Sequence, residues 1–323
     1  MVLRVDGLSK RVKTMRIDIL TIFPDLFTGF LATSIPANAI EVGALSCHVH
    51  DIRTHAANRH RKVDDRPFGG GPGMVMMCQP IFDAVKAAES QDSAVPHDRV
   101  VRVLLSPQGE RLTQPRVEWL AQQSRLLLLC GHYEGIDERV IEELKPLEIS
   151  LGDYVLSGGE LGAMVLIDAV ARLQPGVLGH KDSAAEDSFS VRSSDGAHLL
   201  DCPHFTRPRE WNGREVPEVL LSGDHQAVAR WRDAQRIERT RTRRPDLLQE
   251  SPLLESQLPV SPNLQKPNET RPLPAAKSHK ASAQVARPTR PPVLVNPMST
   301  KPMSTDEVID DTGLHGQTAP EGA

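Results

Sequence analysis

The chain has 323 residues, a formal net charge of −4 and 39% hydrophobic residues, a length that suits about two domains. Its uncharged apolar runs hold only a few residues, far short of the roughly 20 that cross a bilayer, so we expect no membrane segment. The four cysteines lie far apart without a CxxC pair, which argues against a zinc site and a disulfide framework.

The first 14 residues are expected to be an extension ahead of the folded part, and the start of translation is either Met1 or Met15. They include basic residues but no apolar stretch and no small-residue cleavage site of the kind found in signal peptides. We therefore expect a cytoplasmic protein.

Strand and helix patterns alternate from Met15 onward. Short apolar runs predict strands starting at Met15 and at residues 45–53, 101–106, 126–129 and 147–151. Apolar residues at helical spacing predict helices at residues 81–89, 114–123 and 161–173. This alternation predicts an α/β fold with a parallel sheet.

Two glycine-rich segments, CGHYEG at residues 130–135 and GDYVLSGGE at 152–160, each follow a predicted buried strand. In open α/β sheets ligands bind outside the carboxyl ends of the strands, and glycine lets the backbone approach a ligand closely. Together the segments hold both tyrosines of the chain, Tyr133 and Tyr154, which are either pocket or core residues. We favour two loops that close on one ligand.

The C-terminal third changes character. A helix predicted at residues 224–244 carries an arginine cluster, which favours either a phosphate-rich partner or an ordinary solvated helix face: Arg230, Arg232, Arg236, Arg239, Arg241, Arg243 and Arg244. Residues 251–323 are rich in proline and contain no aromatic residue, so we expect a disordered tail. A role of this tail as an adaptor for SH3-type domains is a weaker alternative.

Several ordered motifs resemble the bacterial tRNA (guanine-N1)-methyltransferase family, a branch of the trefoil-knotted (SPOUT) methyltransferases. The resemblance covers about residues 15–250 and rests on the strings VDDRPFGGGPGM, LLSPQGERL, CGHYEGIDERV, LGDYVLSGGEL, AEDSF and LDCPHFTRP. It implies a deep C-terminal trefoil knot, which pattern reading would discourage because knots are almost absent among proteins. GGGPGM lacks the GK[ST] of a P-loop, so we exclude an NTPase.

The resemblance also implies a domain plan. Residues 15–178 would form the knotted S-adenosylmethionine-binding domain, 179–200 an interdomain linker, and 201–250 a small, mainly helical tRNA-binding domain. In this family three loops hold S-adenosylmethionine, here residues 104–109, 130–135 and 151–159. The expected cofactor-binding residues are Leu105, Pro107, Gly131, Tyr133, Gly135, Leu151, Gly152, Asp153, Tyr154, Val155, Leu156 and Gly158.

The resemblance assigns the chemistry to two residues that spacing alone would not single out. Asp187 matches the general base that removes the N1 proton of guanine, although an aspartate in a linker is ordinarily a turn former. Arg172 matches the arginine that stabilises negative charge on the guanine O6, although an arginine at a helix C-terminus is also favoured by the helix dipole.

The implied substrate is tRNA with guanosine immediately 3′ of the anticodon, and the implied assembly is a homodimer. The arginine cluster and residues 59–62 would contact RNA phosphates. Glu134 would lie near a magnesium ion, but its ligands stay unassigned because one carboxylate is a weak metal signal. The alternatives are a ribose 2′-O-methyltransferase of the same fold and a non-catalytic RNA-binding protein.

Three segments depart from the family pattern. Leu104 stands where an aromatic residue is common, the SIPANA segment at residues 34–39 replaces a glycine-arginine version, and VRSSDGAH at 191–198 suggests a longer linker. Because of Leu104 we expect weaker stacking on the adenine of the cofactor, and because of the longer linker we expect a different segment to close over the site.

Overall fold

The computed structural model describes residues 14–91, 99–179 and 184–248. The predicted disordered tail at 251–323 and nearly all of the predicted N-terminal extension lie outside the described residues. Among the described residues, no helix is both long enough and apolar enough to cross a membrane.

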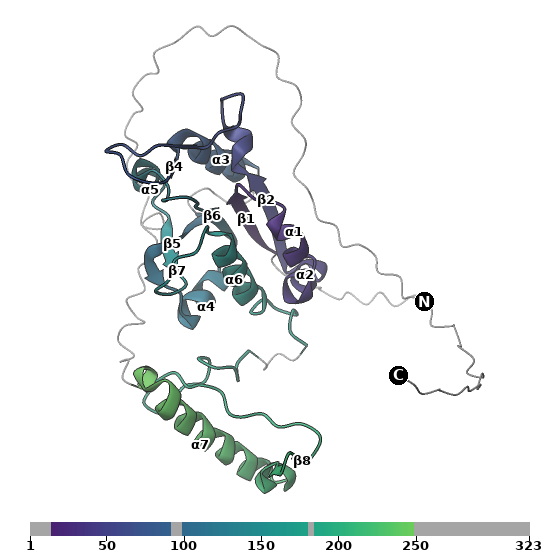
Figure 1. Cartoon of the computed structure of the whole chain (residues 1–323). Coiled ribbons are helices and arrows are strands. Elements are labelled where there is room, and N and C mark those ends of the chain that lie inside the picture. Colours follow the sequence, from purple (N-terminus) through teal and green to yellow (C-terminus); the bar gives the residue numbers. More distant parts are fainter. Residues whose placement is uncertain (1–13, 92–98, 180–183, 249–323) are drawn as a thin grey trace, which may run out of the picture.

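A five-stranded sheet forms the centre of the N-terminal part (Figure 1). Its strands are β1 (Met15–Thr21), β2 (Leu45–Asp51), β5 (Val101–Arg111), β6 (Arg125–Cys130) and β7 (Leu147–Ser150). Their order is β2-β1-β6-β5-β7, and every neighbouring pair is parallel. The predicted parallel α/β fold is therefore confirmed.

Helices cover both faces of this sheet because its strands are apolar on both sides. Leu126 and Leu128 of β6 pack in the same core as α1 (Leu26–Leu31), α2 (Ser34–Glu41), α4 (Gln114–Ala121) and α6 (Glu160–Ala171). Leu127 and Leu129 point to the opposite face, towards α3 (Cys78–Ser90) and α5 (Glu138–Leu144). Successive side chains of a strand alternate between faces, so this run of leucines supplies both cores.

The predicted elements are confirmed, but two of them are longer than expected. Helix α3 begins at Cys78, three residues before the predicted start. Strand β5 continues to Arg111 because it pairs with β7 twice, with a register shift between Leu105 and Glu110. The long polar loop after β2 contains η1 (Ile52–His55), β3 (Asp64–Asp65) and β4 (Val75–Met76).

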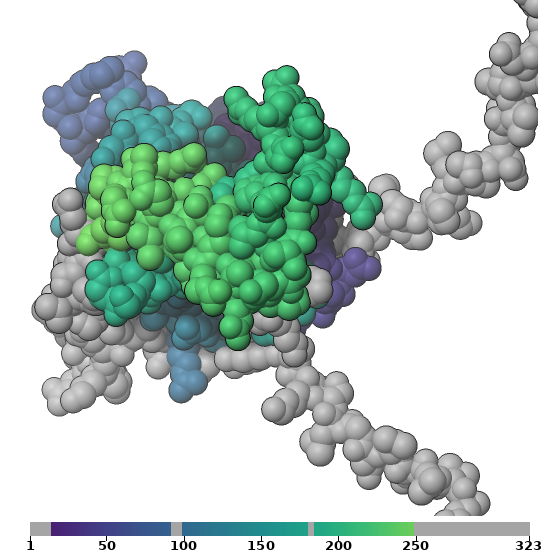
Figure 2. All heavy atoms as spheres, turned by 90° about the horizontal axis from the view of Figure 1, so that it is seen from below, coloured from purple at the N-terminus to yellow at the C-terminus, as the bar shows by residue number. Residues whose placement is uncertain are grey.

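The C-terminal part is dominated by α7 (His225–Arg243), which confirms the predicted helix at 224–244. Asp224 caps it by accepting hydrogen bonds from the backbone of Gln226 and Ala227. The hairpin β8 (Glu210–Trp211) and β9 (Arg214–Glu215) and the short helices η3 (Glu218–Leu221) and η4 (Pro245–Leu248) accompany it. This part lies outside the two helix layers and spreads over one end of the molecule (Figures 1 and 2).

A cluster of charges on the sheet is centred on Asp18 and Arg125, whose side chains are fully buried. Asp18 of β1 accepts hydrogen bonds from Arg125 of β6 at 2.8 Å and from Arg16, and His50 of β2 lies 2.8 Å from it. Burial alone would raise the pKa of Asp18, but the hydrogen bonds from His50 and Arg16 and the charge of Arg125 lower it overall. These contacts tie three neighbouring strands together.

Candidate functional site

Three loops at one edge of the sheet enclose a cavity of about 290 Å³. The first lies at the register shift within β5, the other two follow β6 and β7, and the carboxyl ends of parallel strands meet at one edge. Eleven of the twelve residues predicted to bind the cofactor line this cavity: Leu105, Pro107, Gly131, Tyr133, Gly135, Leu151, Gly152, Tyr154, Val155, Leu156 and Gly158. Its size lies close to the range of small-molecule sites.

Asp153 is the twelfth of these residues and does not line the cavity. Its side chain is 90% exposed and forms an ion pair with Arg111 at 3.0 Å. Its predicted role in cofactor binding stays a prediction, and only its backbone is placed within the third loop.

Close backbone packing joins the second loop to the third. The backbone N–H of Gly159 donates to the carbonyl of Gly131 at 2.9 Å. A Cβ atom on Gly159 would lie 2.8 Å from the Cα atom of Cys130, closer than real side chains come. Gly159 is therefore required by the contact between the loops, whereas its own φ of −78° is ordinary.

Both tyrosines belong to the cavity and not to the core. Tyr133 is 50% exposed and Tyr154 is 57% exposed, and both line the cavity. Tyr133 adopts a φ of 62°, a left-handed conformation that is unfavourable for a bulky residue. Backbone strain of this kind collects at ligand sites.

A buried polar chain, which sequence reasoning missed, braces the cavity. The imidazole of His132 lies 2.6 Å from Oε2 of Glu160, and Oε1 of Glu160 accepts the hydroxyl of Thr21 at 2.6 Å. Glu160 is 3% exposed and begins α6. His132 belongs to the CGHYEG string that marked the loop. Glu160 lies 28 residues further along the chain, and nothing in the sequence spacing indicated that the two side chains are in contact.

The glycine-rich loop before β4 is hydrogen-bonded to the second cavity loop. Met76 donates its backbone N–H to Gly135 at 2.9 Å, and Glu134 donates to Met74 at 3.0 Å. A Cβ atom on Gly73 would lie 2.2 Å from Oε1 of Glu134. The glycine thus makes room for a carboxylate at the wall of the cavity.

The two predicted catalytic residues meet at the other end of α6. Arg172 caps its C-terminus, and Nη1 of Arg172 lies 2.6 Å from Oδ2 of Asp187, an ion pair that lacks the angles of a hydrogen bond. Glu160, at the first turn of α6, contacts the cavity residue His132. Twelve residues of helix separate Glu160 from Arg172, a rise of about 18 Å.

The arginines of α7 fall into two groups. Arg230, Arg232 and Arg243 are exposed, and no ion pair of theirs is found in the part of the chain that the structure describes. Arg236 is 7% exposed and forms ion pairs with Glu186, Asp201 and Asp233. Neither a phosphate contact nor a solvated helix face, the two alternatives for the cluster, describes Arg236, which is buried among Asp233 and two acids distant in the sequence.

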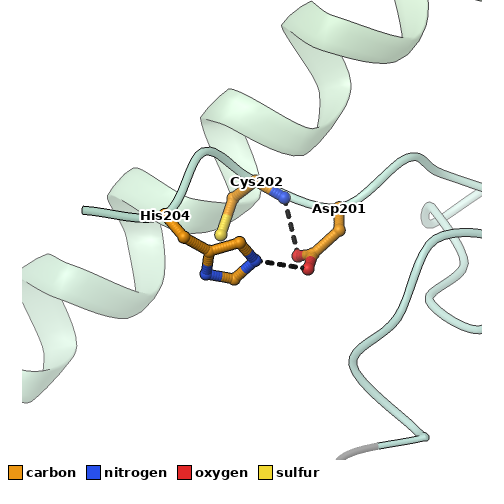
Figure 3. Close-up of side chains that lie close together, drawn as sticks. All are labelled: Asp201, Cys202 and His204. Carbon is orange, nitrogen blue, oxygen red and sulfur yellow. Dashed lines mark hydrogen bonds and ion pairs between the residues drawn. The ribbon is translucent and has the colours of Figure 1, made fainter. Parts of the chain in front are cut away.

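Asp201, Cys202 and His204 gather on the segment beside α7 (Figure 3). Oδ2 of Asp201 lies 2.8 Å from Nε2 of His204, and its Oδ1 accepts the backbone N–H of Cys202. The guanidinium of Arg236 lies 3.6 Å from Asp201, so a cation already faces this carboxylate. The cluster is better explained as an anchor for the segment than as a metal site.

The matching family model and the similar proteins agree with one another and cover nearly all of the residues that the structure describes. The family model described as tRNA (Guanine-1)-methyltransferase TrmD matches residues 15–250. A tRNA (guanine-N(1)-)-methyltransferase of Moorella thermoacetica is 55% identical over 237 residues, which cover 72% of this chain and 90% of the relative. Proteins of the same name from Geobacillus kaustophilus and Halalkalibacterium halodurans are 52% and 50% identical, covering 75% and 79% of this chain and 95% and 100% of the relatives.

Proposed function

The chain belongs to the tRNA (guanine-N1)-methyltransferase family, and from this premise we propose that it methylates N1 of the guanosine immediately 3′ of the anticodon. The products are N1-methylguanosine in tRNA and S-adenosylhomocysteine. The observation that carries the proposal is the single cavity formed by the three glycine-containing loops that the family motifs mark.

The cavity suits S-adenosylmethionine, which supplies an electrophilic methyl group when bound. Glycines 131, 152, 158 and 159 offer backbone groups at close range, while Leu105 and Pro107 add apolar walls. A side chain at Gly158 would fill the space, because its Cβ would lie 2.0 Å from Nε2 of His132. These residues fit a flat, polar-edged ligand held by main-chain contacts.

Asp187 removes the N1 proton of guanine, which must leave before the lone pair of N1 can attack a methyl group. The resulting negative charge spreads onto O6, where the guanidinium of Arg172 stabilises it. The separation of 2.6 Å between Nη1 of Arg172 and Oδ2 of Asp187 supports these linked roles, because one guanine can then meet both groups.

The active unit is a homodimer in which Asp187 and Arg172 of one subunit serve the cavity of the other. One chain holds the cavity at the first turn of α6 and the ion pair at its C-terminus, and the helix rises about 18 Å from Glu160 to Arg172. Apolar side chains on and beside α1 and α6 are exposed, at 45% for Phe23, 53% for Leu26, 55% for Leu161 and 49% for Val165. A second copy that covers this face would bury them.

The RNA is bound by the exposed arginines of α7, and the enzyme acts in the cytoplasm, where tRNA is modified. Arg232 and Arg243 lie eleven positions apart, and so on one side of the helix, where they suit a phosphate backbone, while Arg230 offers a further exposed cation on the other side. Arg59 and Arg61 of the loop after β2 are also exposed and offer a second contact.

The sheet domain is knotted. Such a path passes one stretch of chain through a loop formed by another, and residues 106–109, between the two β5 residues that pair with Ile149 of β7, leave the regular strand pairing there. The return of the chain from the edge strand β7 to the end of β6, through the bridge between Gly158 and His132, supports the same path.

A magnesium ion would be held close to Glu134, the carboxylate at the cavity wall. Mg²⁺ keeps several waters and binds through one or two carboxylates. Glu134 and Glu138 both line the cavity, but the roles of individual ligands stay unassigned.

The test is transfer of a labelled methyl group from S-adenosylmethionine to an unmodified tRNA transcript, followed by analysis of the product nucleoside. We expect N1-methylguanosine from the intact chain, loss of at least about 100-fold in Asp187→Asn, and full activity in the control Glu142→Gln, at an exposed position of α5 that does not line the cavity. A 2′-O-methylated product would replace the proposal with the ribose reaction. Binding of both substrates without turnover would favour an RNA-binding protein.

A further inference from the structure

The segment that carries Asp187 is folded back on itself. The backbone N–H of Phe189 donates to the carbonyl of Leu199 at 2.8 Å, and that of Asp201 donates to the hydroxyl of Ser188 at 3.0 Å. Leu199 in turn donates to Val191 at 2.9 Å. Asp187 is therefore the first residue of a closed loop that ends at Asp201.

This closed loop is attached to α7 by Thr240, which is fully buried. The hydroxyl of Thr240 accepts the backbone N–H of Leu200 at 2.9 Å and donates to the carbonyl of Arg236 at 2.7 Å. Both hydrogen-bonding functions of the hydroxyl are thus used, one on the helix and one on the loop.

Arg236 makes a second attachment one turn earlier on α7. Its guanidinium lies 3.6 Å from Asp201, the last residue of the loop, and 3.7 Å from Glu186, the residue just before it. The pKa of Asp201 is lowered, since the hydrogen bonds from His204 and Cys202 outweigh the effect of burial. An ionised Asp201 thus faces the buried cation.

The loop needs such support because its backbone is strained close to Asp187. Phe189 has a φ of 72°, a conformation that a bulky side chain avoids. Its ring lies 5.9 Å from the guanidinium carbon of Arg244, near the end of α7. Strained backbone persists only where its surroundings hold it in place.

We propose that Thr240 and Arg236 are positioning residues that fix the loop of Asp187 to the helix that binds the RNA. The inference rests on the function proposed above for Asp187 and for the exposed arginines of α7. The catalytic base and the RNA-binding face then form one unit, so RNA that docks on α7 is held at a defined distance from Asp187.

The first test is hydrogen exchange of the full chain for Thr240→Val, a substitution that keeps the shape and removes the hydroxyl. The matched control is Thr242→Val, because among residues 14–91, 99–179 and 184–248 the hydroxyl of Thr242 bonds to Glu238 of α7 alone. We expect faster exchange at the amides of Phe189, Leu200 and Asp201 in Thr240→Val, with the sheet amides unchanged. If these three amides exchange no faster in Thr240→Val than in the unchanged chain, the proposal is overturned, even if the methylation rate of the variant has fallen.

The second test is steady-state methylation by the same variants. Thr240→Val should lower kcat by about 10- to 100-fold, the effect of a small displacement of a catalytic group, while the KM values for both substrates change less than about threefold. Thr242→Val should match the unchanged chain. Equal rates for the two variants, or a rise in KM with unchanged kcat, would overturn a positioning role.

Combination with Asp187→Asn separates positioning from a general structural defect. If Thr240 acts through Asp187, Thr240→Val should not reduce the residual rate of Asp187→Asn any further. An equal reduction in both backgrounds would overturn the proposal. Arg236→Lys supplies a second probe, since it keeps the charge and should retain more kcat than Arg236→Gln. If the unchanged chain methylates no tRNA, the proposed function fails, while the hydrogen-exchange result still decides whether the loop is anchored.

Discussion

Glu160 and His132 lie 2.6 Å apart and link the first turn of α6 to the second cavity loop. Glu160 is buried and also accepts the hydroxyl of Thr21 at the end of β1. The edge of the His132 ring contacts Phe23, with ring centroids 5.0 Å apart. The pair therefore fixes the spacing between two of the loops that form the cavity.

His132→Ala should weaken binding of S-adenosylmethionine about tenfold or more, because loss of the imidazole leaves the buried carboxylate of Glu160 with one partner fewer. Isothermal titration calorimetry measures this directly. Glu142→Gln is the control, since Glu142 is exposed on α5. An unchanged affinity of His132→Ala for S-adenosylmethionine would show that the contact between His132 and Glu160 does not support the cofactor site.

Gly159→Ala should abolish the cavity without unfolding the sheet. The new Cβ atom would lie 2.8 Å from Cα of Cys130 and 3.1 Å from the nitrogen of Gly131, both backbone atoms that have little freedom to move. We expect loss of cofactor binding with destabilisation of about 1–3 kcal/mol. Calorimetry and urea denaturation measure the two effects. Gly29→Ala, whose Cβ meets nothing within 4 Å, should bind normally.

Subunit complementation tests whether the site is shared between two chains. Asp187→Asn and Gly159→Ala should each be inactive alone, while an exchanged equal mixture should recover about a quarter of full activity, because half of the dimers are mixed and each holds one intact site. No recovery, despite subunit exchange shown by labelled protomers, would place the whole site within one chain.

The sequence predicted the cavity well because its signals are local. Four leucines at 126–129 followed by CGHYEG indicate a buried strand and a ligand loop; the strand is buried, and residues of the CGHYEG segment line the cavity. The strand order, with β6 between β1 and β5, has no local signal, since it depends on crossovers between distant segments. The contacts of Glu160 with His132 and Thr21 were missed for the same reason.

The arginine cluster of α7 shows that the burial of a single side chain, like the strand order, cannot be predicted from the local sequence. A helical pattern gives the face on which each arginine lies, but burial depends on what packs there. Arg236 became an interior residue because Asp201, distant in the chain, supplies a carboxylate to it. The separation of Arg172 from the cavity likewise follows from the length of α6 and not from any motif.

Asp18→Asn should reduce the free energy of unfolding by about 3–5 kcal/mol, because it leaves the buried guanidinium of Arg125 without its carboxylate. The lowered pKa of Asp18 gives a pH dependence with a definite sign. Its contribution is present above about pH 4, the unfolded value, and is lost as pH falls towards the lower folded value. Urea denaturation at pH 7 and at pH 3 checks both: the two chains should differ less at the lower pH.

The exposed face of α7 gives a prediction about salt. Arg232→Gln should weaken tRNA binding and reduce the slope of log affinity against log salt by about one, since one phosphate contact is lost. Binding titrations at several salt concentrations measure the slope. Affinity for S-adenosylmethionine should be unchanged, because Arg232 does not line the cavity. A fall in affinity with an unchanged slope would mean that Arg232 supports the fold of the C-terminal part and does not contact the RNA backbone.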